Sequence, residues 1–165
     1  MERHRLAAII AGAATVLALA PTSIGPAAAG GCWSSKGSER GFARRINGAR
    51  HGRGIGRLKL DPQLSRVARK HSAEMDRGNR LYHTPSSKLR RRVTHWSMLG
   101  ENVGVGGSVK SLHKAFMRSA PHKHNVLGRS YRYVGVGTRS DGGTLWVTVI
   151  FEASKNPGTR LAMSC

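Results

Sequence analysis

Two β-rich runs near the end of the chain constrain the fold most strongly. They cover residues 133–137 and 145–151, and Asp141-Gly142-Gly143 lies between them. Asp-Gly and Gly-Gly pairs favour the tight turns of β-hairpins, and β-branched and aromatic residues favour strands. The sequence therefore predicts an antiparallel strand pair at this end. No period of 20–50 residues repeats, which excludes a solenoid.

Helical signals precede this hairpin, and the clearest is Asp61-Pro62. An N-cap carboxylate followed by proline at the first helical position starts helices. Apolar residues then follow one face until Gly78 ends the pattern. His71 falls on the apolar face, which favours a packed core histidine over a ligand.

Weaker patterns complete the expected order of elements. Periodicity predicts further helices over residues 39–50, 108–117 and 121–127, and residues 58–60 are expected to be extended. Residues 79–98 are basic and irregular, and residues 100–107 are rich in glycine, which indicates a turn. The length of 165 residues fits one domain.

The first 29 residues have the composition of an export signal. A basic start is followed by an apolar stretch and by Ala27-Ala28-Ala29, a small-residue cleavage site. The stretch is shorter than the roughly 20 residues a membrane span needs, and Pro21 and Pro26 interrupt it. We expect a signal peptide over 1–29, a flexible lead-in over 30–38 and one domain over 39–165, with no transmembrane segment in the mature chain.

The cysteines fit export to an oxidising compartment. Cys32 and Cys165 lie close to the two ends of the mature chain, and chain ends often meet on a domain surface. A disulfide between them is therefore expected. A lipid-modified Cys32 is the alternative, but Ala29 stands where such signals usually have leucine.

The charge of the chain points to anionic partners. Lys and Arg number 28 against 8 Asp and Glu, a net charge of +20, with a local peak at Arg90, Arg91 and Arg92. A basic surface attracts polyanions in a salt-sensitive way. Outside a cell these partners are cell-wall or surface polymers, anionic lipids or DNA, although no specific nucleic-acid motif is present. The alternative is that the charge serves solubility alone.

Four motifs occur in a characteristic order. They are Leu81-Tyr82-His83, Gly100-Glu101-Asn102-Val103, the run from Ser119 to Leu127, and Val134-Gly135-Val136-Gly137 followed by Trp146 and Phe151. This set resembles the CAP superfamily, also called SCP-like, in its bacterial secreted form. The resemblance implies an α+β fold, an α-β-α sandwich with a central antiparallel sheet between helical layers.

The resemblance also implies a cleft where histidines and acidic residues meet. His83 and His122 match its two histidines, and Glu101 matches its first acid. Ser119 stands where eukaryotic members have the second acid. The set is therefore a triad at best, with Asn102 beside it as a residue that fixes the backbone.

Three roles remain open for this triad. Two imidazoles and a carboxylate are a ligand set for a divalent metal such as zinc, which we expect to bind weakly because only one acid is present. The same groups could act as general acid and base, or Glu101 could simply hold the histidines. No G-x-S-x-G or H-E-x-x-H motif supports a known hydrolase mechanism.

The sequence thus predicts a secreted, monomeric CAP-like protein that acts outside the cell, in solution or bound to the cell wall. The favoured function is ligand binding in the His/Glu cleft without turnover and with no required cofactor. The alternatives are a peptidase-like hydrolase using His83, Glu101 and His122, and a basic protein that binds anionic polymers.

Overall fold

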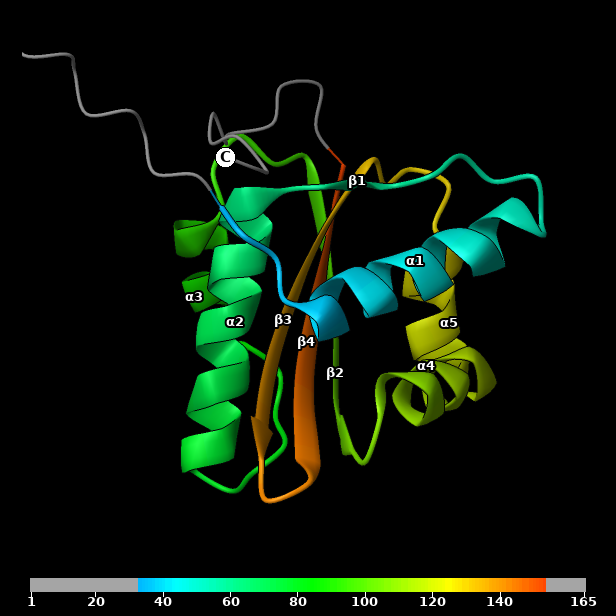
Figure 1. Ribbon diagram of the computed structural model, residues 1–165. Coiled ribbons are helices and arrows are strands. Elements are labelled where there is room, and N and C mark those ends of the chain that lie inside the picture. The colour runs from blue at the N-terminus through cyan, green and yellow to red at the C-terminus, as the bar shows by residue number, and fades with distance from the viewer. Residues whose placement is uncertain (1–32, 154–165) are drawn as a thin grey trace, which may run out of the picture.

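The computed structural model describes residues 33–153. Within them the chain forms helices on both faces of one sheet (Figure 1). The elements in order are α1 (Gly37–His51), β1 (Lys59–Leu60), α2 (Pro62–Arg77), α3 (Ser86–Arg92), β2 (Met98–Gly106), α4 (Val109–Arg118), α5 (Ala120–Leu127), β3 (Tyr133–Asp141) and β4 (Thr144–Ala153).

The sheet has the strand order β1-β3-β4-β2. The three long strands are antiparallel, while the two-residue β1 runs parallel to β3, so the sheet is mixed. The turn between β3 and β4 has positive φ at Gly142 and Gly143, 50° and 79°, which glycine adopts without steric cost. The predicted hairpin is confirmed.

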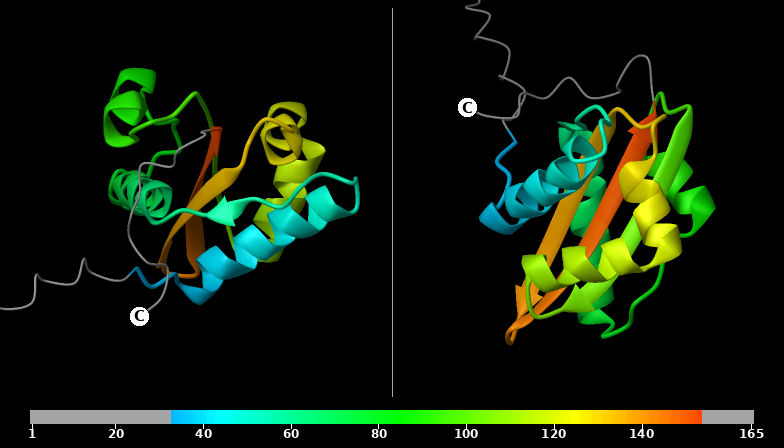
Figure 2. Two further views of the ribbon diagram at one scale, coloured as in Figure 1. Left: turned by 90° about the horizontal axis from the view of Figure 1, so that it is seen from above. Right: turned by 90° about the vertical axis from the view of Figure 1, so that its right-hand side faces the viewer.

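Two helical layers cover the sheet. Viewed from above, α2 and α3 lie on one face, and α1, α4 and α5 lie on the other (Figure 2). Phe42, Leu112, Val134 and Val136 belong to the core under α1, α4 and α5, and Leu64 and Ile150 to the core under α2 and α3. The predicted α+β sandwich is confirmed. None of the helices in the described residues is long and apolar enough to span a bilayer.

Helix α2 begins and ends where the sequence predicts. Asp61 accepts a hydrogen bond from the Leu64 amide at 2.8 Å, which satisfies one of the free donors of the first turn, and Gly78 ends the helix. His71 is fully buried, and its Nε2 lies 2.8 Å from the Tyr82 carbonyl. The prediction of a core histidine is confirmed.

Two elements differ from the sequence predictions. Residues 86–92, expected to be irregular, form helix α3, which Lys88 and Arg92 tie to Glu74 of α2 by ion pairs of 2.9 and 3.0 Å.

Partial burial by itself would raise the pKa of Glu74. The hydrogen bonds and positive charges of Lys88 and Arg92 together outweigh that burial and lower the pKa to about 2.

The second difference is β2, because the glycine-rich segment expected to turn is an extended strand. It pairs with β4 along its whole length, from Met98 opposite Ala153 to Gly106 opposite Leu145. A Cβ at Gly104 would lie 3.0 Å from the ring of Phe116. The glycine therefore lets helix α4 pack closely on the strand, rather than bending the chain.

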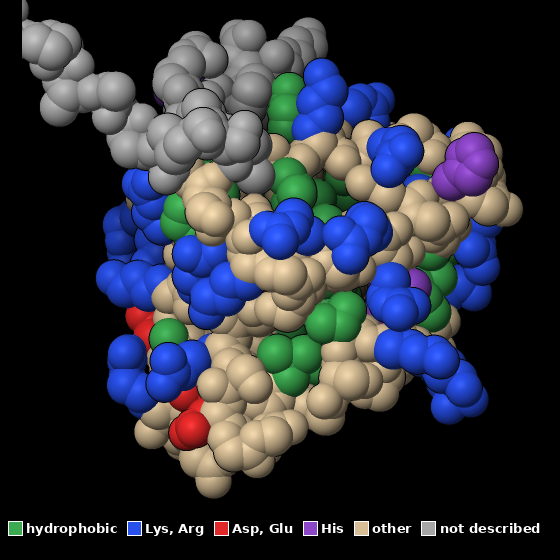
Figure 3. Space-filling view, in the orientation of Figure 1, with side chains coloured by type: hydrophobic (Ala, Val, Ile, Leu, Met, Phe, Trp, Pro, Cys, Tyr) green, Lys and Arg blue, Asp and Glu red, His purple; other side chains and the backbone are tan. Residues whose placement is uncertain are grey.

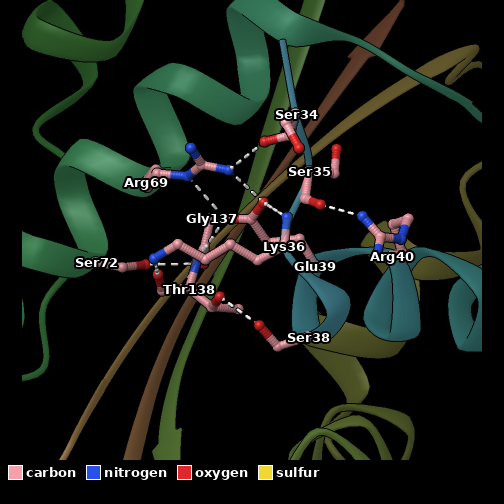
Figure 4. A network of polar contacts seen from close by, with 10 residues as sticks. All are labelled: Ser34, Ser35, Lys36, Ser38, Glu39, Arg40, Arg69, Ser72, Gly137 and Thr138. Carbon is pink, nitrogen blue, oxygen red and sulfur yellow. Dashed lines mark hydrogen bonds and ion pairs between the residues drawn. The ribbon is translucent and has the colours of Figure 1, made fainter. Parts of the chain in front are cut away.

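The lead-in expected to be flexible over 30–38 is anchored from Trp33 onward. Trp33 is buried beneath Arg69, whose guanidinium carbon lies 4.0 Å from the indole centroid. Arg69 also binds Glu39 through two hydrogen bonds, and Glu39 accepts from the amides of Lys36 and Thr138 (Figure 4). This network joins the start of α1 to α2 and β3.

Candidate functional site

Glu101 holds the first of the two site histidines. It lies on β2, is almost fully buried, and accepts from the Thr84 amide at 2.8 Å through Oε1. The same oxygen lies 2.9 Å from Nδ1 of His83, in the loop between α2 and α3. The side chain of His83 is 59% exposed. A buried carboxylate therefore fixes an imidazole that solvent can reach.

His122 lies on the first turn of α5 and is held from two sides. Its ring stacks on Phe116 at a centroid distance of 4.7 Å, and its Nδ1 lies 2.9 Å from the hydroxyl of Ser119. Burial lowers the pKa of His122 from 6.5, and the charge of His83 lowers it further. The lowered pKa favours the neutral form of the His122 imidazole.

Buried amides set the position of α5 relative to β2. Asn102 is fully buried and donates to the His122 carbonyl at 2.9 Å. Asn125 donates to the Asn102 side chain at 2.9 Å and to the Glu101 carbonyl at 3.2 Å. The expected backbone-fixing role of Asn102 is the one observed. These bonds hold α5 against β2. We use the name histidine face for the set His83, Glu101, Ser119 and His122.

Sequence reasoning missed two residues of this arrangement. Asn125 lies three positions after His122, one helical turn away on the same side of α5, and this spacing is the signal that could have identified it. Thr84 contributes only its backbone amide to Glu101, so its side-chain identity carries no signal.

The expected metal triad does not fit the geometry. Among residues 33–153, no three His, Cys, Asp or Glu side chains are arranged to hold a metal ion. Oε1 of Glu101 already accepts from Thr84 and contacts His83. Oε2 is buried and has no hydrogen-bond partner in that part of the chain.

The three consecutive arginines of α3 do not form one patch. Successive residues of a helix lie about 100° apart around its axis. Arg90 and Arg91 are exposed, and Arg90 lies over the ring of Trp96 at 5.5 Å. Arg92 instead turns toward α2 and pairs with Glu74. The predicted polyanion site thus loses one member.

The predicted signal peptide and the Cys32–Cys165 disulfide lie outside the described residues.

Comparisons with known proteins agree with this fold. The family model described as CAP, the cysteine-rich secretory protein family, matches residues 43–151. The uncharacterized protein YkwD of Bacillus subtilis (strain 168) is 27% identical over an alignment of 115 residues that covers 66% of this chain. The chain spans only 44% of the length of that relative.

Two solved structures share the fold. An outer surface protein of Borrelia burgdorferi matches with a TM-score of 0.63 at 16% identity, over 69% of this chain and 90% of that one. An extracellular protein of Bacillus anthracis containing an SCP domain matches with a TM-score of 0.61 at 24% identity, over 70% and 41%. With the family match over most of the described residues, the chain belongs to the CAP family of cysteine-rich secretory proteins.

Proposed function

We propose that this chain is a secreted binding domain that takes its ligand on the histidine face without chemical turnover. The observation that carries the proposal is the fixed orientation of the exposed His83 side chain. Its imidazole is exposed, yet the buried carboxylate of Glu101 holds it in one orientation. An exposed side chain ordinarily loses rotamer entropy when it binds a ligand, and a side chain held in advance loses less.

The two imidazoles offer polar contacts to such a ligand. When Nδ1–H of His83 donates to Glu101, Nε2 is left as a hydrogen-bond acceptor. Nε2 of His122 has no hydrogen-bond partner among the described residues, and the lowered pKa of the ring favours its neutral form. Such groups recognise hydroxyl and amide hydrogens, so we infer a ligand rich in both, such as a glycopeptide fragment of the cell wall.

The hydrolase alternative has less support because no relay is assembled. Nucleophilic catalysis needs a base that activates the nucleophile and a third group that orients the base. The hydroxyl of Ser119 contacts Nδ1 of His122, but the carboxylate of Glu101 is bonded to His83 and not to His122. The third member of a relay is therefore engaged elsewhere.

The place of action follows from the same proposal. The first 29 residues have an export pattern, and the names of two structural relatives describe an outer surface protein and an extracellular protein. We infer that the domain acts outside the cell, where the 26 Lys and Arg against 7 Asp and Glu of residues 30–165 favour contact with anionic surface polymers.

A soluble muropeptide, the disaccharide-peptide unit of peptidoglycan, tests the proposal. We expect the wild-type protein to bind it in calorimetry, with perturbed imidazole resonances of His83 and His122 in NMR spectra. His83→Ala should weaken binding at least about tenfold, the loss of roughly one hydrogen bond to a held group. His124→Ala is the matched control, because His124 is an exposed histidine on the same helix as His122, and it should leave the affinity unchanged.

The same samples separate the alternatives. Cleavage of the muropeptide that disappears in Glu101→Gln would favour the hydrolase. Equal weakening by His83→Ala and His124→Ala, or no binding to the wild-type protein, would refute the proposal.

A further inference from the structure

Four arginines line one small hollow on the side of the molecule where α1 ends and α5 leads into β3. The hollow has a volume of about 190 Å³, and its walls include Arg50, Arg57, Arg129, Arg132 and Tyr131. We call it the arginine pocket. Its residues come from the end of α1, from the loop after α1 and from the connection between α5 and β3.

Arg50 forms the fixed wall of this pocket. It is 1% exposed, and its Nε donates to the Gly56 carbonyl at 2.7 Å. Its Nη1 donates to the carbonyls of Val126 and Gly128, both at 2.9 Å. These bonds satisfy carbonyls at the end of α5, where the helix dipole favours a cation. Arg50 thus brings a buried positive charge to the pocket and also holds its walls together.

Within residues 33–153, no acidic side chain forms an ion pair with the pocket arginines. The ion pairs of the described residues join Glu39, Glu74, Asp76 and Glu101 to side chains outside the pocket. Burial lowers the pKa of Arg50, and the positive charges of Arg132 and Arg129 lower it further. Like charges gathered without a counterion are unfavourable, and an anion that entered would relieve the repulsion.

The remaining arginines keep hydrogen-bond donors free. Arg132 uses Nη1 to hold the carbonyls of Arg129 and Tyr131, at 2.6 and 3.0 Å, which orients its guanidinium. Arg57 and Arg129 are exposed and make no side-chain hydrogen bond within residues 33–153. Guanidinium groups match phosphate and carboxylate geometry. A phosphodiester presents two free and two ester oxygens around a tetrahedral phosphorus, so arginines from separate segments can meet it from several directions, whereas the two oxygens of a carboxylate lie in one plane.

We propose that the arginine pocket binds a phosphate group of an extracellular phosphodiester polymer. The inference rests on the proposed action at an anionic surface and gives it a site distinct from the histidine face. Lys and Arg side chains are spread over the face seen in Figure 3, whereas Asp and Glu occupy few positions there, so a polymer chain would meet favourable potential beyond the pocket. The exposed large apolar side chains of the described residues are Leu81, Met98 and Val105, none of which lines the pocket, and this argues against a lipid chain.

Linear polyphosphate is the probe, and two double variants are compared with the wild-type protein by calorimetry at several salt concentrations. Arg57→Ser with Arg129→Ser removes two pocket arginines but keeps Arg50, which the fold needs. Arg90→Ser with Arg91→Ser removes the same charge from exposed positions on α3. We expect the pocket variant to lose at least about tenfold in affinity and to show a shallower salt dependence, because fewer counterions are released. The α3 variant should lose less than about threefold.

The outcomes are distinguishable. Equal losses of affinity in the two variants would show that the attraction is diffuse. That result would overturn the pocket as a binding site but would leave binding at an anionic surface intact. No binding of either polyphosphate or phosphatidylglycerol vesicles by the wild-type protein would overturn both. Inorganic phosphate should compete only weakly, and equally tight binding of the free ion would contradict a polymer site. Binding to phosphatidylglycerol vesicles without binding to polyphosphate would replace the polymer with a lipid surface.

Discussion

Replacement of Gly137 by alanine is expected to lower the free energy of unfolding by at least about 3 kcal/mol. Gly137 lies on β3 directly beneath α2, and a Cβ built there would overlap backbone atoms of Ala68 and Arg69. Backbone cannot move aside as the end of a side chain can, so α2 would have to lift from the sheet. That movement would also break the 2.9 Å hydrogen bond from Ser72 to the Gly137 carbonyl.

Gly48→Ala is the matched control for this change. Gly48 lies inside α1, and nothing approaches within 4 Å of the position of its missing Cβ. Alanine should therefore raise stability there by roughly 0.5–1 kcal/mol through helix propensity. Urea unfolding of both variants measures the effects. A loss below about 1 kcal/mol in Gly137→Ala would mean that α2 does not lie on β3 as described.

The stability of the protein is expected to fall between pH 5.5 and 8 because of Glu152. This carboxyl on β4 is 1% exposed, and its Oε1 has no hydrogen-bond partner in the described chain. Burial, and then the nearby charge of Asp61, raise its pKa from 4.5 to about 7. The folded state therefore keeps a proton that the unfolded state releases. The stabilisation is complete below pH 4.5 and is lost as the pH rises through about 7.

Glu152→Gln should remove this pH dependence, since the amide is neutral throughout. Between pH 5.5 and 8 the wild-type protein should lose about 2 kcal/mol more stability than the variant does. The comparison with the variant cancels the titration of the histidines. The control variant Asp141→Asn replaces an exposed acid in the hairpin, and its stability should depend on pH as that of the wild-type protein does. Parallel stability profiles for wild type and Glu152→Gln would show that Glu152 is ionised in the folded state at pH 5.5.

Local signals in the sequence predicted the elements that carry their own stop and start residues. Asp61-Pro62 and Gly78 bound α2, and Gly142-Gly143 forms the hairpin turn. Helix α3 and strand β2 were missed because distant residues stabilise them. Glu74 of α2 holds α3 through ion pairs, and β4 supplies the hydrogen bonds of β2. Neither partner is visible in a local window of sequence.

The candidate site depended on the family resemblance. His83, Glu101 and His122 have no local pattern in common, and only the order of motifs indicated that they belong together. The contact between Asn125 and Asn102 was not predicted, because it joins a helix to a strand. The basic run of α3 was read as one patch, whereas helical geometry turns Arg92 toward Glu74. The gathering of Arg50, Arg129 and Arg132 likewise follows from the fold, not from spacing.

The most direct test of the histidine face is an NMR titration of the His122 imidazole. The ring is partly buried, and the charge of His83 adds to the effect of that burial, so the pKa of His122 should lie below 6.5. His83→Ala should raise the pKa of His122, because one of the two causes of the lowering is removed, while His124→Ala should leave it unchanged. A His122 pKa at or above 6.5 that does not respond to His83→Ala would contradict the pairing of the two histidines on one face.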